Sequence, residues 1–362
     1  MDGKGNSLIV VGAGVWGLSC ALVCAQRGWA VTVLEARQVG SGASGGIVGA
    51  MAPHTPDNWN PKKQFQFEAL DQADAFWADV EKRAGKSTGY GRIGRVQPIS
   101  DVAGLRLATD RGAGAQSLWA GRHTWQVIDR PNWLSPDQAP FGVIHDTLSA
   151  RIHPAKATAA LGHAVVGGGV EILEGVNVTD LSQTGVVVNG KSRDADAVIV
   201  AAGVGGFDLL APFTARAPGT GQKGQAALLG CDLRGRPQLY ADGLYIVPHA
   251  DGTTAVGSTS ENTYVDPIAT DVLLEDVIIR ARALMPELTD APIVQRWVGL
   301  RPKPRKRDPM LGPIPGLDRH FAALGAFKIG FGLAGKVATT LADCIENRGS
   351  VPESFLVSSQ MK

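Results

Sequence analysis

The chain has 362 residues, of which 44% are apolar and 19% charged, and its formal net charge is +1. This length predicts about two domains, and the composition is that of a globular protein rather than a disordered or fibrous one. A net charge near zero excludes an overall basic field that would favour nucleic acid or anionic lipid. Four cysteines without a CxxC pair exclude a disulfide framework.

The first 35 residues predict a βαβ unit. Residues 8–11 (LIVV) are typical of a buried parallel strand, residues 18–27 predict a helix, and residues 29–34 predict a second strand. Residues 8–25 are apolar enough to resemble a membrane span or a secretion signal, but glycines interrupt them and Arg27 follows too early. We therefore expect no membrane span and a cytoplasmic location.

The turn after the first strand, GAGVWG, has the G-x-G-x-x-G spacing of a dinucleotide-binding site. Gly12 permits the tight turn, Gly14 lets the backbone approach a pyrophosphate, and Gly17 lets helix and strand pack closely. The following helix N-terminus offers free amide groups to the anion. Glu35, after the second strand, can accept hydrogen bonds from ribose hydroxyls and disfavours the 2′-phosphate of NADP.

Three later segments favour FAD over NAD. The Gly/Ser/Ala-rich residues 40–53 follow Glu35 closely and suit backbone contact with a bulky ligand. Residues 194–206 predict an apolar strand ending in Ala-Ala-Gly, which we expect to return beside the first unit. Residues 320–345 predict a strand, a glycine loop and a helix, and would bring a second helix N-terminus towards the cofactor.

The remaining elements predict a helical layer and an antiparallel sheet. Residues 64–83 have the spacing of an amphipathic helix, and Cys20 and Cys24 are one turn apart on a helix face that we expect to be buried. Residues 222–298 alternate apolar and polar side chains, with Asp-Gly turns at 242–243 and 251–252. A helix is expected over 271–284, closed by Pro286, with core positions Leu273, Leu274, Val277 and Ile278.

Together these segments resemble the D-amino-acid oxidase superfamily of FAD-dependent oxidoreductases, and most closely its glycine oxidase, sarcosine oxidase and D-amino-acid dehydrogenase members. The resemblance covers nearly the whole chain, from the βαβ unit and GASG through KGQ, LYIVPHADGTTAVGST and WVGLRP to the closing glycine loop. It implies an α/β (α+β) fold, with a Rossmann-like FAD-binding domain interleaved with an antiparallel-sheet substrate domain. The FAD domain is expected over 1–84, 149–214 and 299–362, and the substrate domain over 85–148 and 215–298.

The resemblance implies three side chains in the substrate site. Arg301, in WVGLRP, matches an arginine that binds the substrate carboxylate, for which its planar fork is suited. Tyr245, in LYIVPH, matches a tyrosine that lies over the substrate. Lys328 stands where glycine oxidases have an arginine, and it either binds the carboxylate as a point charge or favours electron transfer to oxygen. Lys223, in QKGQ, is expected either to tune the flavin or to form a structural ion pair.

The implied cofactor contacts are mostly made by the backbone. No cysteine stands in RPKPRKRDPMLGPIP, where sarcosine oxidases attach FAD covalently, so we expect non-covalent FAD. The histidines do not cluster with Cys or Asp at ligand spacings, so no metal site is expected. The residues expected to contact FAD are Gly12, Gly14, Val15, Trp16, Gly17, Glu35, Ala36, Ala43, Ser44, Val48, Gly49, Ala50, Val178, Gly203, Ala326, Phe327, Lys328, Ile329, Gly330, Phe331 and Gly332.

The implied activity is oxidation of a small amino acid or secondary amine by hydride transfer to flavin N5, giving an imine that hydrolyses. Oxygen or a quinone would accept the electrons, and the chain could form a homo-oligomer. Ala50 and Ser260 replace methionines of glycine oxidase, which implies a roomier pocket and leaves the substrate open.

Two alternatives to this activity stay open. GASGGIVGAMAP and RDPMLGPIPG also resemble the FAD domain of the enzyme that oxidises carboxymethylaminomethyl-uridine in tRNA, although the low net charge counts against nucleic acid. The other alternative is a flavoprotein subunit of a heteromeric dehydrogenase, which predicts an exposed apolar patch.

Overall fold

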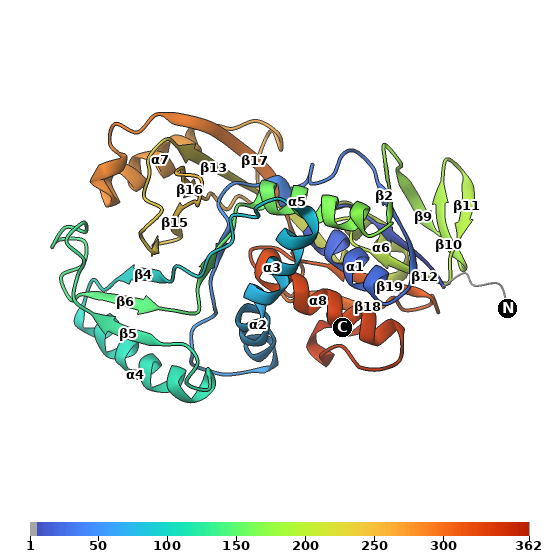
Figure 1. The fold of residues 1–362 in the computed structure, drawn as a ribbon, viewed down its shortest axis with the longest axis horizontal. Coiled ribbons are helices and arrows are strands. Elements are labelled where there is room, and N and C mark those ends of the chain that lie inside the picture. The colour runs from blue at the N-terminus through green and yellow to red at the C-terminus, as the bar shows by residue number, and fades with distance from the viewer. Residues whose placement is uncertain (1–5, 362) are drawn as a thin grey trace.

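A computed structural model describes residues 6–361 and contains two large sheets with helices packed against them (Figure 1). The first sheet has the strand order β18-β19-β12-β1-β2-β8, and its neighbouring strands are parallel except for the antiparallel pair β18 and β19. Its strands are β1 (Ser7–Val11), β2 (Ala30–Glu35), β8 (Glu171–Glu174), β12 (Ala197–Val200), β18 (Met310–Pro313) and β19 (His320–Leu324).

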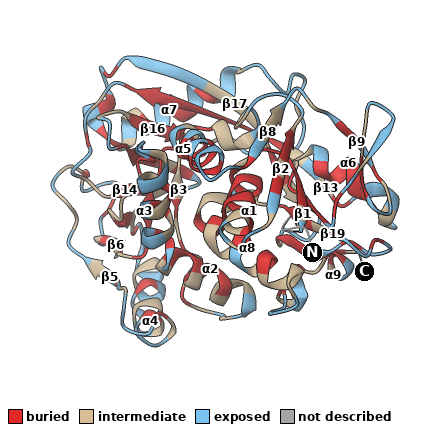
Figure 2. Cartoon of the chain, turned by 45° about the vertical axis from the view of Figure 1, so that its right-hand side comes forward, coloured by how far each residue is buried: buried red, intermediate tan, exposed pale blue. Residues whose placement is uncertain are grey.

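The side chains of β1 alternate between two hydrophobic layers. Leu8 and Val10 pack towards the helices α1 (Val15–Gln26), α5 (Pro154–Gly167) and α8 (Gly330–Ile345). Ile9 and Val11 pack on the other face, where α6 (Gly205–Leu210) and a three-stranded sheet lie. Both faces are therefore covered, which is why this strand is apolar at every position from 8 to 11. Figure 2 shows the resulting burial of β1, β2 and α1.

The predicted βαβ unit is confirmed, with small shifts at its ends. β1 pairs in parallel with β2 on one side and with β12 on the other, so the predicted Ala-Ala-Gly strand does return beside the first unit. The helix α1 begins at Val15, three residues before the predicted start. Cys20 and Cys24 are fully buried in it, and burial raises the pKa of both thiols.

The second sheet has eight strands in the order β17-β13-β16-β15-β14-β4-β6-β5. All neighbours are antiparallel except β14 and β4, so the expected antiparallel sheet contains one parallel pairing. Its strands are β4 (Arg95–Pro98), β5 (Trp125–Ile128), β6 (Val143–Asp146), β13 (Gly219–Leu229), β14 (Gln238–Ala241), β15 (Leu244–Pro248), β16 (Thr254–Gly257) and β17 (Ile293–Pro304).

One face of this second sheet packs against α7 (Val272–Leu284), and the other faces the first sheet's loops. Leu274, Val277 and Ile278 of α7 join the core formed by that face, whereas the predicted core position Leu273 is 43% exposed. The expectation for Leu273 was wrong because the buried face of α7 is formed by residues 274, 277, 278 and 281, which leaves residue 273 at its edge. The opposite face packs against Ile47, from the Gly/Ser/Ala-rich loop.

The helix predicted over residues 64–83 is divided in two. α2 (Pro61–Asp71) starts at the N-cap Asn60, and α3 (Ala73–Ala84) follows after Gln72. α2 packs mainly against α8, whereas α3 packs mainly against α5. One straight helix cannot follow both partners, so tertiary packing breaks a pattern that is continuous in the sequence.

Shorter elements connect these layers. β3 (Ala50–Met51) pairs with β7 (Ala150–Arg151), and β9 (Val178–Leu181), β10 (Gly185–Val188) and β11 (Lys191–Asp194) form the three-stranded sheet. α4 (Val102–Leu118) packs against β5, and α9 (Val357–Gln360) packs beside β18. Four 3-10 turns complete the described residues: Ala43–Gly45, Ala211–Phe213, Pro286–Leu288 and Glu353–Phe355.

The first sheet takes its strands from within residues 1–84, 149–214 and 299–362, while the second takes most of its strands from the intervening ranges. β17 runs across the expected boundary at 298/299, so this strand links the two parts. Between residues 6 and 361, no helix combines the length and the apolar character needed to cross a membrane.

Candidate functional site

A cavity of about 820 Å³ lies where the loops of the first sheet meet the inner face of the second. It is lined by the ends of β1, β2 and β12, by the Gly/Ser/Ala-rich loop, by β14, β15 and β17, and by the segment before α8. The predicted site residues that line it are Gly12, Gly14, Val15, Trp16, Glu35, Ala36, Ala43, Ser44, Val48, Gly49, Ala50, Val178, Gly203, Tyr245, Arg301, Ala326, Phe327, Lys328, Ile329, Gly330 and Phe331.

Two of the predicted cofactor residues, Gly17 and Gly332, do not line the cavity. A Cβ on Gly17 would lie 1.9 Å from the Gly12 carbonyl oxygen, so this glycine lets α1 pack on the preceding turn. A Cβ on Gly332 would lie 2.9 Å from Leu70 Cδ2, so this glycine lets α8 pack against α2. The structure therefore places both glycines in helix packing.

The N-terminus of α1 forms a cradle suited to a pyrophosphate. Gly12 has φ +104°, and a Cβ there would lie 2.7 Å from the Ala201 carbonyl oxygen. Ser44 Oγ accepts the amide of Val15 at 3.0 Å, while the N-cap, Gly14, supplies no capping side chain. The remaining free amides and the positive end of the helix dipole favour an anion at this place.

Glu35 is fixed at the end of β2. Its Oε2 accepts the amide of Ala13 at 2.8 Å, and its Oε1 accepts the amide of Arg37 at 2.9 Å. An ionised carboxylate has further lone pairs, so it can still accept hydrogen bonds from ribose hydroxyls. The placement of this acid beside the glycine turn fits an adenosine ribose.

A second helix N-terminus meets the first one at the cavity. Trp16 Nε1 donates to the Gly330 carbonyl at 2.8 Å, which ties the start of α1 to the start of α8. Phe327, just before α8, has φ +45°, and its neighbours Ala326 to Phe331 line the cavity. Two helix N-termini, a glycine cradle and a ribose acid thus fit FAD.

Arg301 projects from β17 into the substrate end of the cavity. Its side chain is buried, with Nη2 donating to Ser258 Oγ at 2.6 Å and Nη1 donating to the Thr259 carbonyl at 3.1 Å. Burial lowers the pKa of Arg301 to about 10, against the opposing effect of Glu261. No carboxylate of the described residues pairs with this guanidinium, so its charge is free for a ligand.

Tyr245 lines the cavity from β15, and a buried ion pair lies behind it. Arg95 Nη1 donates to the Tyr245 hydroxyl at 3.4 Å, and Arg95 Nε donates to Asp146 at 2.8 Å with both charged side chains almost fully buried. Burial raises the pKa of Tyr245, so the hydroxyl stays protonated and can donate a hydrogen bond. Tyr240 packs against Tyr245, with ring centroids 4.6 Å apart and the two rings tilted by 43°.

Lys328 enters the cavity from the loop before α8. Its Nζ donates to Ser260 Oγ at 2.8 Å and lies 5.6 Å from the centre of the Phe327 ring. Burial lowers the pKa of Lys328, and the positive charges of Arg301, Lys303 and Arg307 lower it further. Arg301 and Lys328 therefore place two positive charges at the same end of the cavity.

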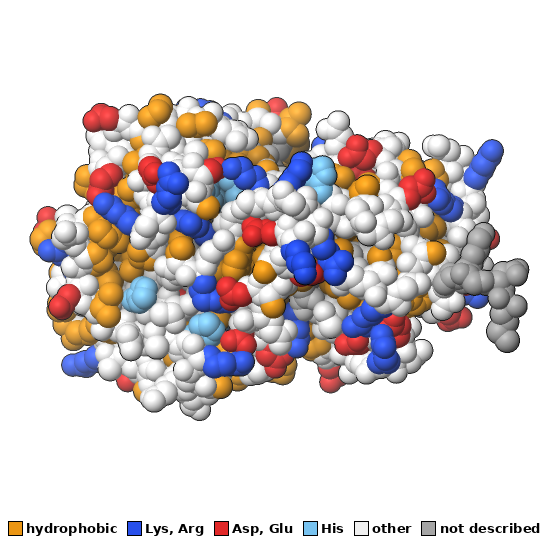
Figure 3. All heavy atoms as spheres, viewed as in Figure 1, with side chains coloured by type: hydrophobic (Ala, Val, Ile, Leu, Met, Phe, Trp, Pro, Cys, Tyr) orange, Lys and Arg blue, Asp and Glu red, His pale blue; other side chains and the backbone are white. Residues whose placement is uncertain are grey.

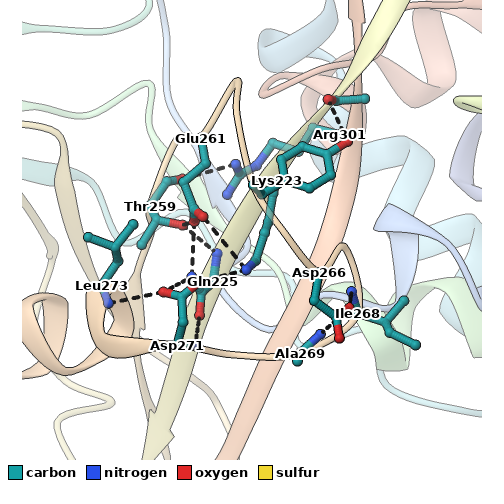
Figure 4. A network of polar contacts seen from close by, with 12 residues as sticks. Lys223, Gln225, Thr259, Glu261, Asp266, Ile268, Ala269, Asp271, Leu273 and Arg301 are labelled. Atoms are coloured by element: carbon teal, nitrogen blue, oxygen red, sulfur yellow. Dashed lines mark hydrogen bonds and ion pairs between the residues drawn. The ribbon is translucent and has the colours of Figure 1, made fainter.

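Lys223 lies on the opposite face of β13 from the cavity. It is 1% exposed, and its Nζ lies 2.7 Å from Asp271 and 3.7 Å from Glu261 (Figure 4). In the β13–β17 register Gln222 lies opposite Arg301, so Lys223 faces the other way. Of the two roles expected for Lys223, the structure therefore supports the structural ion pair.

Sequence reasoning missed several residues that line the cavity. Tyr240 pairs directly with Tyr245 across the turn at 242–243, so the recognised Asp-Gly turn already contained the signal for it. Trp297 lies four residues before Arg301 on β17, and the period of two for strands places them on one face. His54 has no comparable signal; its Nδ1 is buried without a hydrogen-bond partner.

No group of three or more His, Cys, Asp or Glu side chains within residues 6–361 is arranged to hold a metal ion. A Rossmann-like cradle that opens on a sheet-lined cavity with a buried arginine defines a flavin-dependent oxidoreductase. The chain belongs to the DAO family of FAD dependent oxidoreductases, which it matches over residues 7–344. It is therefore an enzyme, and its family uses FAD.

One relative in sequence supports this assignment, and two solved structures share the fold. A glycine oxidase from Pseudomonas putida is 30% identical over 346 residues, covering 91% of each chain. The crystal structure of glycine oxidase from Geobacillus kaustophilus has a TM-score of 0.86 at 21% identity and covers 97% of this chain and 98% of its own. That of iminodiacetate oxidase from Chelativorans sp. BNC1 has a TM-score of 0.86 at 21% identity, covering 96% and 98%. The two structures establish the fold.

Proposed function

We propose that this enzyme oxidises a small amino acid or secondary amine that carries a carboxylate, giving an imine that hydrolyses. The observation that carries the proposal is Arg301, a buried guanidinium that lines the cavity without a carboxylate partner among the described residues. Leaving a buried charge unpaired costs free energy, which a substrate carboxylate recovers when it binds. The name of the Pseudomonas putida relative, glycine oxidase, agrees with an amino-acid substrate.

Each side chain of the site has a task in this proposal. Arg301 binds the carboxylate with its fork, which Ser258 and Thr259 hold in place. Tyr245 donates its hydroxyl to the same carboxylate, oriented by Arg95. The positive charges of Arg301 and Lys328 favour the neutral amine over the ammonium form, and only the neutral form can lose a hydride. Bound FAD would supply the hydride acceptor, N5.

We also propose that the predicted cofactor residues lining the cavity hold FAD non-covalently, so that acid precipitation releases the flavin into solution. The cradle at α1 supports this, together with the absence of cysteine from the lining residues described here. The division into domains at 1–84, 149–214 and 299–362 against 85–148 and 215–298 is proposed on the two sheets. A cytoplasmic location, a homo-oligomer, and oxygen or a quinone as acceptor stay predictions.

The two alternatives find less support. On the face seen in Figure 3, Lys and Arg side chains are mixed with Asp and Glu rather than gathered into one basic field. A tRNA substrate requires phosphate contacts from such a field. The alternative of a subunit in a heteromeric dehydrogenase requires an exposed apolar patch. The most exposed large apolar side chains are Val265 and Ile268.

Anaerobic reduction of the enzyme-bound flavin tests the proposal. Glycine, sarcosine, D-alanine, L-proline and N-carboxymethylated amines would be mixed with the enzyme while the flavin absorbance is followed. We expect one of these classes to bleach the flavin, and Arg301→Ala to lower the apparent second-order rate constant on the order of 10- to 100-fold, the effect of losing a charge-assisted hydrogen bond.

Arg305→Ala is the matched control, because Arg305 is an exposed arginine just beyond the end of β17. The substrate should reduce the flavin of this variant at the same rate as the flavin of the unaltered enzyme. If no amine bleaches the flavin, the small-amine function is wrong. If Arg301→Ala is reduced as fast as the unaltered enzyme, Arg301 is not the carboxylate ligand.

A further inference from the structure

The substrate end of the cavity contains two cations and no acid. Among the described residues that line the cavity, Glu35 is the single carboxylate, and both of its oxygens accept backbone amides at the end of β2. Arg301 and Lys328 lie in the other part, where Ser258 also contributes to the lining. Neither cation has a carboxylate within salt-bridge distance among the described residues, although Glu261 acts on Arg301 from beyond Thr259.

Three consecutive residues hold both cations. Ser258 Oγ and the Thr259 carbonyl accept from Arg301, and Ser260 Oγ accepts from Lys328. These contacts come from neutral groups, which orient the two cations without cancelling their charge. Figure 4 shows that Thr259 also connects Arg301 to the network around Lys223, since its hydroxyl donates to Glu261 and accepts the amide of Gln225. Because Arg301 comes from β17 and Lys328 from the loop before α8, this short segment sets their mutual position.

Two other cations with little exposure are paired with carboxylates, whereas the buried Arg151 donates, among the described residues, only to the carbonyls of Arg234 and Pro248. Arg95 is paired with Asp146, and Lys223 with Asp271 and Glu261. Each of these carboxylates is within salt-bridge distance of its cation. A buried charge without a partner is costly unless a ligand completes it. Within the described part of the chain, Arg301 is buried without a carboxylate partner, as Arg151 is, but only Arg301 lines the cavity. The more exposed Lys328 lines the same cavity, so a ligand there can reach both Arg301 and Lys328.

FAD does not supply both missing charges. The isoalloxazine of oxidised FAD is uncharged, and its pyrophosphate is expected at the N-terminus of α1, where the glycine cradle lies. A single substrate carboxylate compensates one positive charge. A second negative group on the same ligand would compensate the charge of Lys328.

We propose that the substrate is an amine with two carboxylates, one bound by Arg301 and the other by Lys328. This inference rests on the proposed function, from which it takes Arg301 as the ligand of the first carboxylate. The class that fits best is a secondary amine with a carboxylate on each side of the nitrogen. Its oxidised carbon is the methylene next to the carboxylate held by Arg301.

The reaction of this class is balanced with the cofactor already proposed. The methylene loses a hydride to FAD and the nitrogen loses its proton, which gives the imine and reduced FAD. One water then adds to the imine carbon and the C–N bond breaks. One carboxylate leaves on an aldehyde, and the other stays on the primary amine.

Binding of two thioethers to the FAD-loaded enzyme tests the proposal without turnover. Thiodiacetate has two carboxylates and (methylthio)acetate has one, and sulfur replaces the oxidisable nitrogen in both. Isothermal titration calorimetry should find that thiodiacetate binds more tightly by on the order of 10-fold or more, since it gains a second charge-assisted contact. Equal affinities for the two thioethers would overturn the proposal.

Variants of Lys328 test whether this side chain causes the preference for thiodiacetate over (methylthio)acetate. Lys328→Met should reduce the preference to below about threefold, with little change for (methylthio)acetate, whereas Lys328→Arg should retain it. Lys303→Met is the matched control, because Lys303 is a nearby lysine that bonds Asn262 and does not line the cavity. It should retain the preference as well.

Two further outcomes would overturn the proposal. If Lys328→Met weakens both thioethers equally, Lys328 shares the first carboxylate with Arg301. If Lys303→Met abolishes the preference as fully as Lys328→Met does, the preference reflects the general positive field.

Flavin reduction by sarcosine and iminodiacetate separates this proposal from the proposed function. Reduction by sarcosine, with no binding preference for two carboxylates, overturns the inference and leaves the function. Lys328-dependent binding of thiodiacetate by an enzyme that no amine reduces overturns the function and leaves the two-carboxylate site.

Discussion

Gly224 of β13 leaves the space that the Arg301 guanidinium fills. A Cβ on Gly224 would lie 2.1 Å from Cζ and from both terminal nitrogens of Arg301. We therefore expect Gly224→Ala to displace the guanidinium from its contacts with Ser258 and Thr259. The KM for the carboxylate substrate should rise on the order of 10-fold, with a smaller change in kcat.

Steady-state kinetics of Gly224→Ala checks this expectation, with Gly235→Ala as the control. A Cβ on Gly235 meets nothing within 4 Å, and its φ lies outside the positive range, so this change should leave KM unaltered. A KM for Gly224→Ala equal to that of the unaltered enzyme would contradict the assigned place of Arg301.

At the scale of single residues, the sequence was most informative where a residue type has one physical purpose. Gly12, Gly14 and Glu35 were predicted as cofactor contacts because few other residue types can serve there, and all three line the cavity. Lys223 could not be assigned, because its partners Glu261 and Asp271 are 38 and 48 residues away along the chain and meet it only in the fold. His54 was missed for the same reason, since its burial depends on tertiary contacts.

At the scale of elements, the N-terminus of α7 is joined to β13 by one carboxylate. Asp271 caps α7 by accepting the amide of Leu273 at 3.0 Å, and it also accepts from Lys223 and Gln225 at 2.7 Å each. The Lys223 contact is the main reason that the pKa of Asp271 is lowered to about 2. Asp271→Ala should therefore lower the free energy of unfolding by more than the loss of a helix cap alone.

Urea unfolding measures this difference, and Asp101→Ala is the matched control. Asp101 caps α4 by accepting the amide of Gly104 and has no ion-pair partner within the described range, so its loss should cost about 1 kcal/mol. A loss for Asp271→Ala that is no larger than the loss for Asp101→Ala would show that the link to Lys223 adds nothing.

Element boundaries were predictable where local signals dominate. Asp271 caps the N-terminus of α7, and Pro286 begins the 3-10 turn that follows its C-terminus. Both are local signals that the sequence alone shows. The break at Gln72 was not predictable, because it follows from α2 and α3 packing against different helices. The period of the apolar residues indicates that a segment is helical. It does not indicate where packing against another helix breaks the segment in two.

At the scale of the whole molecule, His249 makes stability depend on pH. Its Nε2 lies 2.7 Å from the Ile47 carbonyl, and burial, aided by the charges of His153 and Arg151, lowers the pKa of His249 from 6.5 to about 4. Between these values the unfolded chain binds a proton that the folded protein does not, so stability falls as pH falls. The loss approaches about 3 kcal/mol near pH 4.

Urea unfolding at pH 7 and at pH 4.5 checks this expectation, with His249→Gln as the comparison. The variant loses the carbonyl contact but has no proton to bind in this range, so its stability should fall less as the pH is lowered. Equal losses in the two proteins would assign the acid sensitivity to other groups.

The interleaved arrangement of the two sheets was predictable only through the resemblance to a family. Hydrophobic patterns predicted most strands, but no local signal indicates that β4 pairs with β14 or that β17 crosses the proposed boundary at 298/299. Pairings between segments far apart in the chain depend on the whole fold. The same holds for Ser258 and Lys328, which line one cavity although Ser258 follows β16 of the second sheet and Lys328 follows β19 of the first.

The bond between Trp16 and Gly330 also sets an order of events during protein synthesis. The two residues are 314 positions apart, and the second helix at the cofactor cavity starts at Gly330. At about 5 to 20 residues per second, a ribosome needs roughly 15 to 60 s to make the chain between them. A nascent chain therefore presents its first glycine turn long before it can enclose a flavin, so complete enclosure of the cofactor waits until Gly330 and the helix that follows it have been made.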